Sequence, residues 1–227
     1  ATDTVRVIVT VPRAEVTVRH LLAHASGLSA GFMYTNTVDH LYRAAGYEWG
    51  APPGSTLADC VRDWAALPLR FEPGTAWGYG VSTDVLGRLL EVLTGKTLDE
   101  VFTERVLRPL GMDDTGFFAE GPRADRLPAV YQRDPATGGA LRNDAMSQSG
   151  RVMPTVLSGG GGLVSTLDDY TRFTRMLALE GELDGVRLLT PATVRLMRQN
   201  HLPGDLGQVS TGGFAETGGS APATTST

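Results

Sequence analysis

The sequence predicts an α+β fold that is rich in helices. Several segments open with a capping residue or carry apolar residues at helical spacing. Only one segment, Val5 to Val11 (VRVIVTV), has the β-branched and partly alternating character of a strand. No internal repeat is visible, and 227 residues with 41% hydrophobic content are enough to bury a sizeable core. These observations favour a globular domain built mostly from helices.

The N-terminal part is expected to hold three short helices separated by loops. Thr17 is a typical N-cap for the first, and Gly27 is a typical terminator. The Ala51-Pro-Pro-Gly54 break precedes the cap of the third helix. The expected ranges are Val18 to Ala25, Val38 to Ala45, and Ser55 or Thr56 to about Leu67, with an aromatic-bearing loop from Ser29 to Thr37.

The strongest helical patterns lie in the second half. Ser82 to Leu93 has apolar residues along one face and is closed by Gly95. Two capping boxes follow: one opens a helix that ends before Pro109, and the other opens a helix whose predicted apolar face is Tyr170, Phe173, Met176 and Leu177. The boxes are Thr97 with Glu100 and Thr166 with Asp169. A last helix is expected from Pro191 to about Asn200, and Gly111 to Ser149 is expected to be irregular or short strand.

Composition excludes several classes of function. The net charge is −5 and there is no basic run, which argues against nucleic acid or an anionic membrane surface as a partner. No apolar run is long enough for a membrane span, and the first residues lack the features of a signal peptide, which favours a cytoplasmic location. The single cysteine, Cys60, is expected to be a buried thiol.

Residues 1–211 are predicted to form one partial domain, and residues 212–227 (GGFAETGGSAPATTST) a low-complexity, disordered tail. This tail has almost no large apolar residues, so it cannot bury enough surface to offset the entropy of ordering.

Four short motifs suggest chemistry but are better explained by structure. Gly80-Val81-Ser82-Thr83-Asp84 lacks the second glycine of a nucleophile elbow, so Ser82 is interpreted as a helix cap. Gly95-Lys96-Thr97 lacks the first glycine of a phosphate-binding loop. The run Gly159 to Gly162 indicates close backbone packing or a loop beside a cleft. His20 and His24 have metal-ligand spacing without the glutamate of a metalloprotease, so no metal is expected.

Taken together, the longer motifs resemble serine hydrolases related to class C β-lactamases. V-T-V-R-H-L-L-A-H-A-S-G-L (16–28) is similar to their T-x-x-x-L-L-x-H-T-S-G-L segment, and P-G-T-A-W-G-Y-G-V-S-T-D-V-L-G (73–87) to their P-G-x-x-x-x-Y-S segment. R-P-L-G-M-D-D-T-G-F (108–117) and S-G-G-G-G-L-V-S-T-L-D-D (158–169) follow in the same order. The resemblance covers roughly residues 16–200.

This resemblance implies an acyl-serine mechanism in which Tyr79 assists the base. In the family, the serine of an S-x-x-K motif attacks the substrate, and a tyrosine helps the lysine take the serine proton. A phenol serves as a base near neutral pH only when a nearby cation favours the phenolate. Val81 replaces the asparagine of the β-lactamase Y-x-N motif, which favours the esterase-like branch. Phe32 and Tyr34 are candidates for lining the acyl pocket.

The sequence departs from the family pattern in two places. It contains no S-x-x-K, because its only lysine, Lys96, follows Leu93 at that spacing. The C-terminal strand motif expected near Phe214 is absent as well. We therefore expect the helical region of a β-lactamase/transpeptidase-like fold, truncated at both ends and with most of the antiparallel sheet domain missing.

The resulting functional expectation is a carboxylesterase-like serine hydrolase without a cofactor. This chain alone is expected to be inactive, because no nucleophile lies in it, and a complementary chain carrying the S-x-x-K serine is one possible partner. The substrate is expected to be a small ester, with a lactam as the alternative. The alternative functions are a D,D-peptidase or β-lactamase, and a non-catalytic binding protein on the same fold.

Overall fold

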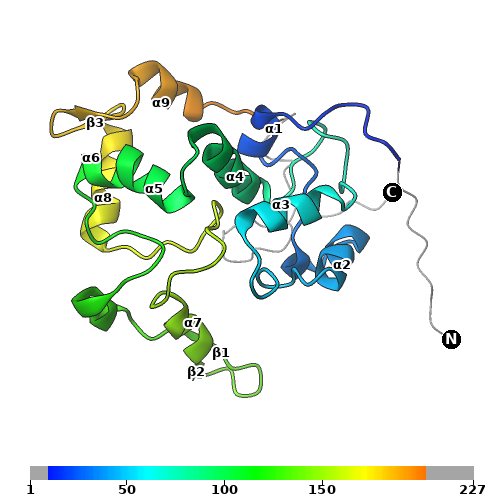
Figure 1. The fold of residues 1–227 in the computed structure, drawn as a ribbon, viewed down its shortest axis with the longest axis horizontal. Helices are drawn as coiled ribbons and strands as arrows, with labels where there is room; N and C mark the ends of the chain where they lie inside the picture. The colour runs from blue at the N-terminus through cyan, green and yellow to red at the C-terminus, as the bar shows by residue number, and fades with distance from the viewer. Residues whose placement is uncertain (1–9, 203–227) are drawn as a thin grey trace. The chain divides into compact units, whose positions relative to one another are not determined.

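The computed structural model describes residues 10–202, and these form parts of two compact units (Figure 1). Of the described residues, the first unit comprises residues 10–89, Ser158–Gly160 and residues 200–202, and the second comprises Leu90–Leu157 and Gly161–Gln199. The predicted strand Val5 to Val11 lies mostly outside the described residues, and Thr10 and Val11 are in no strand. The predicted tail also lies outside them.

The first unit is built from short capped helices, as the sequence predicts. Thr17, Asn36 and Thr56 each accept a hydrogen bond from the backbone N–H three residues later, and each forms a complete capping box. The helices that they open are α1 (Val18–Leu22), α2 (Thr37–Ala44) and α3 (Leu57–Ala65), with a 3-10 turn η1 (Gly31–Met33) between the first two. α4 (Ser82–Thr94) begins where it was predicted.

Cys60 is fully buried in this unit, as expected of a core thiol. It lies on α3 beside Trp64, whose ring meets that of Tyr47 edge to face with centroids 5.5 Å apart. The Tyr47 hydroxyl donates to Asp63 Oδ2 at 2.6 Å, which satisfies its polar end. One turn of α3 thus supplies the buried residues Cys60 and Trp64 and also the carboxylate that accepts the hydrogen bond from Tyr47.

The helix after Thr97 continues further than the sequence predicts. α5 (Leu98–Phe102) passes into a π-helical turn η2 (Thr103–Leu107) and then α6 (Arg108–Leu110). Pro109 lies at the second position of α6, directly after the π-helical turn. The helix ends at Gly111, which adopts the left-handed conformation with φ 62°.

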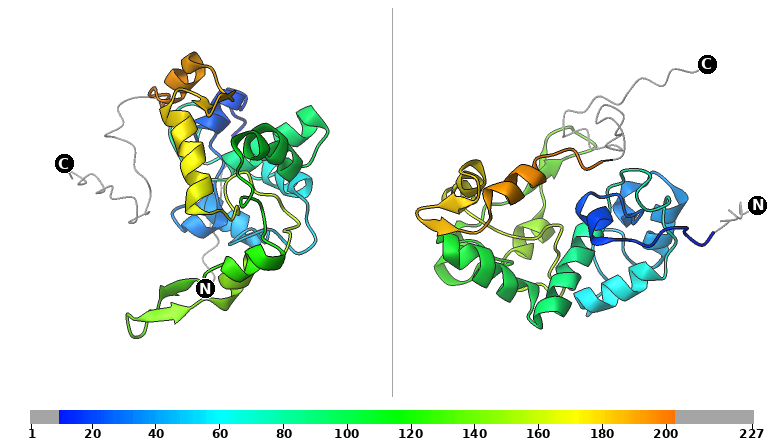
Figure 2. Two further views of the ribbon diagram at one scale, coloured as in Figure 1. Left: turned by 90° about the vertical axis from the view of Figure 1, so that its left-hand side faces the viewer. Right: turned by 90° about the horizontal axis from the view of Figure 1, so that it is seen from above.

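The strands β1 to β4 in residues 10–202 form two small antiparallel hairpins. β1 (Tyr131–Arg133) pairs antiparallel with β2 (Ala140–Arg142), and β3 (Glu182–Leu183) pairs with β4 (Val186–Arg187). Figure 2 shows the first hairpin beside α7 (Asp144–Ser149), and Ser147 Oγ of that helix accepts from the backbone N–H of Val130 at 2.8 Å. A 3-10 segment η3 (Gly121–Arg126) precedes the hairpin. The sequence predicted irregular structure or short strand here, which agrees with β1 and β2, whereas η3 and α7 were not predicted.

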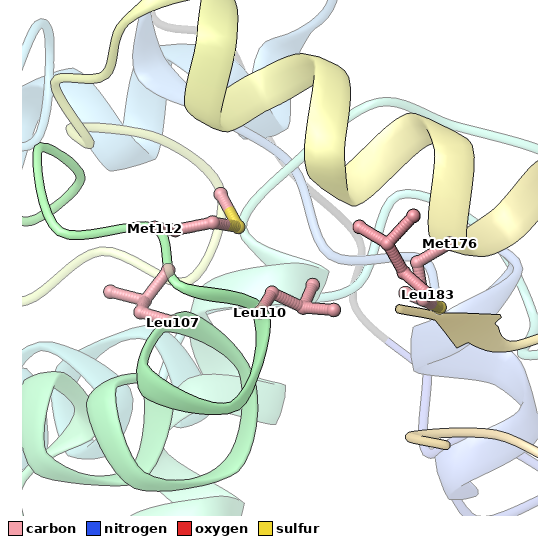
Figure 3. Packing of buried hydrophobic residues seen from close by; sticks show 5 residues of the cluster. All are labelled: Leu107, Leu110, Met112, Met176 and Leu183. Carbon is pink, nitrogen blue, oxygen red and sulfur yellow. The ribbon is translucent and has the colours of Figure 1, made fainter. Parts of the chain in front are cut away.

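The core of the second unit joins the end of α6 to α8 (Leu167–Ala178). Met176 of α8 is buried together with Leu183 of β3 and residues of the η2–α6 segment (Figure 3). The buried members are Leu107, Leu110, Met112, Met176 and Leu183. The predicted face of α8 is correct for Met176 but wrong for Tyr170, which is 59% exposed. α9 (Pro191–Met197) closes the unit, capped by Thr190.

Asp169 ties α8 to a distant loop. Its backbone N–H donates to Thr166 Oγ1, as predicted for the cap, but its buried carboxylate accepts from Asp114 N and Thr115 Oγ1, each at 2.8 Å. Asp169, in the first turn of α8, therefore also fixes the loop at Asp114 and Thr115, more than fifty positions away in sequence.

Within residues 10–202, no helix combines the length and apolar character that crossing a membrane requires.

Candidate functional site

Two sequence segments that lie far apart in the chain run side by side and frame Tyr79. The backbone N–H of Gly78 donates to the carbonyl of His24 at 2.9 Å, and that of Val81 donates to the carbonyl of Ser29 at 3.1 Å. Further backbone bonds of the same kind link Arg70 to Gly27 and Gly74 to Ala25. Because bonds lie on both sides of Tyr79, its Cα is held by backbone contacts as well as by its side chain.

The glycines of both motifs are required by this close approach. A Cβ on Gly80 would lie 2.4 Å from the carbonyl oxygen of Leu28, and a Cβ on Gly27 would lie 2.4 Å from that of Phe71. Gly27 also has φ +83°, which disfavours other residues. Gly78 is close to a different neighbour, since a Cβ on it would lie 2.7 Å from the ring of Phe71.

Tyr79 is half-buried between two other rings. It stacks on His24 with centroids 5.5 Å apart and an interplanar angle of 8°, and Phe32 meets it at 6.0 Å and 63°. Phe32 in turn stacks on the exposed Trp49 at 5.6 Å, and Trp77 lies 6.2 Å from His24. Phe32 is therefore next to Tyr79, while its role in lining an acyl pocket stays a prediction.

Tyr34, the other predicted pocket residue, has different neighbours. It is 57% exposed, its hydroxyl donates to a carboxylate oxygen of Glu48, and the guanidinium of Arg43 lies 4.1 Å from its ring centroid. The Arg43 contact is a cation–π interaction. These contacts give no support to a direct interaction between Tyr34 and Tyr79.

Two serines of the paired segments, Ser26 and Ser82, bond to each other. Ser26 Oγ and Ser82 Oγ are 2.8 Å apart and both residues are fully buried, and Ser26 Oγ also accepts from the N–H of Leu28. The sequence interpretation of Ser82 as a helix cap is thereby corrected, because Ser82 is the first residue of α4 and its hydroxyl bonds to Ser26. Neither hydroxyl is available as a nucleophile.

A buried carboxylate supports the segment that carries Ser29. Asp39 is fully buried and accepts from Ser29 Oγ, from the backbone N–H of Thr35 at 2.8 Å, and from that of Asn36 at 3.1 Å. Burial raises the pKa of Asp39, but these hydrogen bonds to the charged form outweigh it and hold the pKa below its ordinary value. Asp39 therefore stays ionised and anchors the loop before α2.

The glycine-rich loop packs against the first turn of α4, as its sequence suggested. A Cβ on Gly159 would lie 2.2 Å from the carbonyl oxygen of Thr83, and the hydroxyl of Ser158 donates to Asp84 Oδ1 at 2.5 Å. The backbone N–H of Gly160 also points to Asp84 Oδ1, at 3.4 Å. Asp84 thus links the start of α4 to this loop.

His24 and His20 have separate roles, and neither is placed to bind a metal. His20 completes the capping box of α1 through Nδ1. His24 lies on Tyr79, with Nε2 3.3 Å from Thr83 Oγ1. Burial lowers the pKa of His24, and the opposing effect of Asp84 is smaller, so the imidazole is neutral near pH 7. Among residues 10–202, no group of three or more His, Cys, Asp or Glu is arranged to hold a metal ion.

Lys96, the only lysine in the sequence, is paired with a carboxylate. Lys96 Nζ forms an ion pair with Glu104, with contacts of 2.5 and 2.6 Å to its two carboxylate oxygens.

Comparison with known proteins identifies the family. The beta-lactamase family profile matches residues 3–219. The chain belongs to the beta-lactamase family. Among the relatives similar to it is protein Rv1367c of Mycobacterium tuberculosis, which is 38% identical over 84% of this chain and 45% of the relative. Another is the lovastatin esterase of Penicillium rubens, which is 33% identical over 84% of this chain and 46% of the esterase. The chain thus spans about half the length of these curated relatives.

A solved structure shows the same fold. EstCE1, a hydrolase with promiscuous acyltransferase activity, is 28% identical, with a TM-score of 0.67 over 83% of this chain and 51% of EstCE1. The resemblance to the β-lactamase family inferred from the sequence motifs is thus confirmed, as is the helix-rich, partial α+β fold.

Sequence reasoning missed two features of the site. The stack of His24 on Tyr79 joins residues from two different segments, and the only sequence signal for it was that His24 belongs to a family motif. Trp49, which extends the row of rings beyond Phe32, carries no motif at all. Both depend on contacts between segments distant in the chain.

Proposed function

We propose that this chain supplies the tyrosine part of the active site of a carboxylester hydrolase or acyltransferase that works through an acyl-serine. The observation that carries the proposal is the placement of Tyr79, held by backbone hydrogen bonds on both sides and by the stack on His24. The similarity to relatives named esterase or acyltransferase supports the same class of reaction. The serine and lysine of S-x-x-K come from residues outside this sequence, in the same polypeptide or on a complementary chain.

The proposed chemistry requires a cation beside Tyr79. A tyrosine acts as a base near neutral pH only beside a positive charge. His24 is neutral, and Lys96 is paired with Glu104. The lysine of S-x-x-K supplies this charge, so that the phenolate takes the serine proton as serine Oγ bonds to the acyl carbon. The proton then passes to the departing alcohol as the ester C–O bond breaks.

An ester is proposed over a lactam because of Val81. Its backbone N–H is already donated to Ser29, and its side chain has no amide with which to hold a peptide-like carbonyl. A substrate that needs no such hydrogen bond, a small carboxylic ester, fits this position best.

Turnover of p-nitrophenyl butyrate tests the proposal. The chain alone is expected to be inactive, whereas the polypeptide that joins it to an S-x-x-K segment is expected to hydrolyse the ester. In that polypeptide, Tyr79→Phe should lower kcat by about 10²- to 10⁴-fold. Tyr131→Phe, at a 58% exposed position in β1, is the matched control and should have no effect.

Four outcomes would contradict the proposal. Turnover by this chain alone that disappears in Tyr79→Phe would place the nucleophile within it. Full activity of Tyr79→Phe in the joined polypeptide would remove Tyr79 from the chemistry. Labelling by penicillin without ester turnover would favour a D,D-peptidase or β-lactamase, and absence of fluorophosphonate labelling would favour a non-catalytic binding protein.

A further inference from the structure

The ring of His24 covers the ring of Tyr79 in a nearly parallel stack. The centroid separation of 5.5 Å at 8° is an offset stacking geometry, which aromatic pairs favour. Phe32 meets Tyr79 edge to face rather than in parallel, at 63°. The plane of the Tyr79 ring is therefore closely matched by the plane of the His24 ring.

His24 is fixed by groups that are independent of Tyr79. Its backbone lies in the left-handed region with φ 51°, where His, Asn and Asp are the non-glycine residues most often found. Its carbonyl accepts from Gly78, and Nε2 lies 3.3 Å from Thr83 Oγ1 of α4. An imidazole that is held from its backbone and from its far edge can serve as a rigid surface for another ring.

The His24 imidazole carries no charge into this stack. Its Nδ1 is buried and has no hydrogen-bond partner within residues 10–202. Protonation would leave a buried N–H of a cation without an acceptor, which costs free energy. A neutral ring can orient Tyr79 but cannot act as the cation that a tyrosine base requires.

We propose that His24 is a positioning residue for Tyr79: the neutral imidazole fixes the plane of the phenol ring and so directs its hydroxyl, and this role rests on the function proposed above for Tyr79. Correct orientation of a reacting group contributes strongly to rate, and a displacement of about 1 Å can cost about 10²-fold. His24 itself transfers no proton and touches no reacting atom in this proposal.

The stack is tested first on this chain by NMR, with ring-labelled tyrosine and Tyr79 assigned by its loss in Tyr79→Phe. His24→Asn keeps a residue suited to the left-handed backbone but removes the ring, and His24→Phe keeps a flat ring without the nitrogens. Tyr79 ring resonances should shift in His24→Asn and return toward wild type in His24→Phe, while those of the other tyrosines stay unchanged. His40→Asn, at an exposed position of α2, is the control. Unchanged Tyr79 resonances in His24→Asn would overturn the proposal.

Kinetics in the polypeptide that includes S-x-x-K then separate positioning from simple support of the fold. His24→Asn should lower kcat by up to about 10²-fold with KM changed less than about twofold, and His24→Phe should recover most of the loss. In the Tyr79→Phe background, His24→Asn should cause no further loss. If Tyr79→Phe is inactive but His24→Asn keeps full kcat, the role of His24 is wrong. If Tyr79→Phe is fully active, the proposed function fails instead, whatever the NMR result.

Discussion

Replacing Asp39 with alanine is expected to destabilise the unit that holds Tyr79 by about 2–4 kcal/mol. The fully buried carboxylate accepts from two backbone N–H groups, those of Thr35 and Asn36, and from Ser29 Oγ. A hydroxyl can turn to another acceptor, but a backbone N–H cannot. Each donor left without an acceptor away from water costs about 1–3 kcal/mol, and the lower half of the range for two donors applies because Thr35 is exposed and Asn36 is only partly buried.

Urea unfolding followed by far-UV circular dichroism measures this change, with the free energy of unfolding taken from the first transition. Asp125→Ala is the matched control, since this exposed carboxylate in η3 should change stability by less than about 0.5 kcal/mol. If Asp39→Ala unfolds within about 0.5 kcal/mol of wild type, the argument that this carboxylate anchors the loop is refuted.

Three further predictions concern the same unit. The pKa of Asp39 lies below its ordinary value, so the stability contributed by its carboxylate is present above about pH 4 and is lost as the pH falls through the folded-state pKa. The difference in urea midpoint between wild type and Asp39→Asn should therefore narrow in acid. A difference that stays constant with pH would contradict this. Burial raises the pKa of Cys60, so its thiol should react with Ellman's reagent only on unfolding, and immediate reaction in native buffer would show that it is accessible. Gly80→Ala should lower the free energy of unfolding by about 1–3 kcal/mol, since the added Cβ would lie 2.4 Å from a carbonyl oxygen. The control Gly50→Ala, whose Cβ would have no atom within 4 Å, should leave the urea unfolding curve unchanged.

Local features of this fold could be predicted from sequence because they depend on residues a few positions apart. The capping residues Thr17, Thr56 and Thr190 each begin a helix at the expected place. The buried state of Cys60 followed from residue type alone. Tyr79 emerged from the order of family motifs, and the family assignment is confirmed, while its catalytic role remains a prediction.

Features that depend on distant contacts could not be predicted. Ser82 has the sequence of a helix cap, but a second serine, Ser26, lies against it and takes its hydrogen bond. Tyr170 has helical spacing with Met176, yet it is exposed, because periodicity alone does not show how wide the buried face of α8 is. The π-helical turn before Pro109 likewise has no marker in the residues that form it.

The contact between Ser158 and Asp84 has a consequence for the order of folding. These residues are 74 positions apart, so the first unit contains a piece of chain that is synthesised only after Leu90–Leu157, the larger part of the second unit's sequence. The loop-closure entropy grows slowly with length, so such a late contact costs little in equilibrium stability. It does delay completion of the unit, because the first turn of α4 must wait for the glycine-rich loop before Asp84 gains its partners.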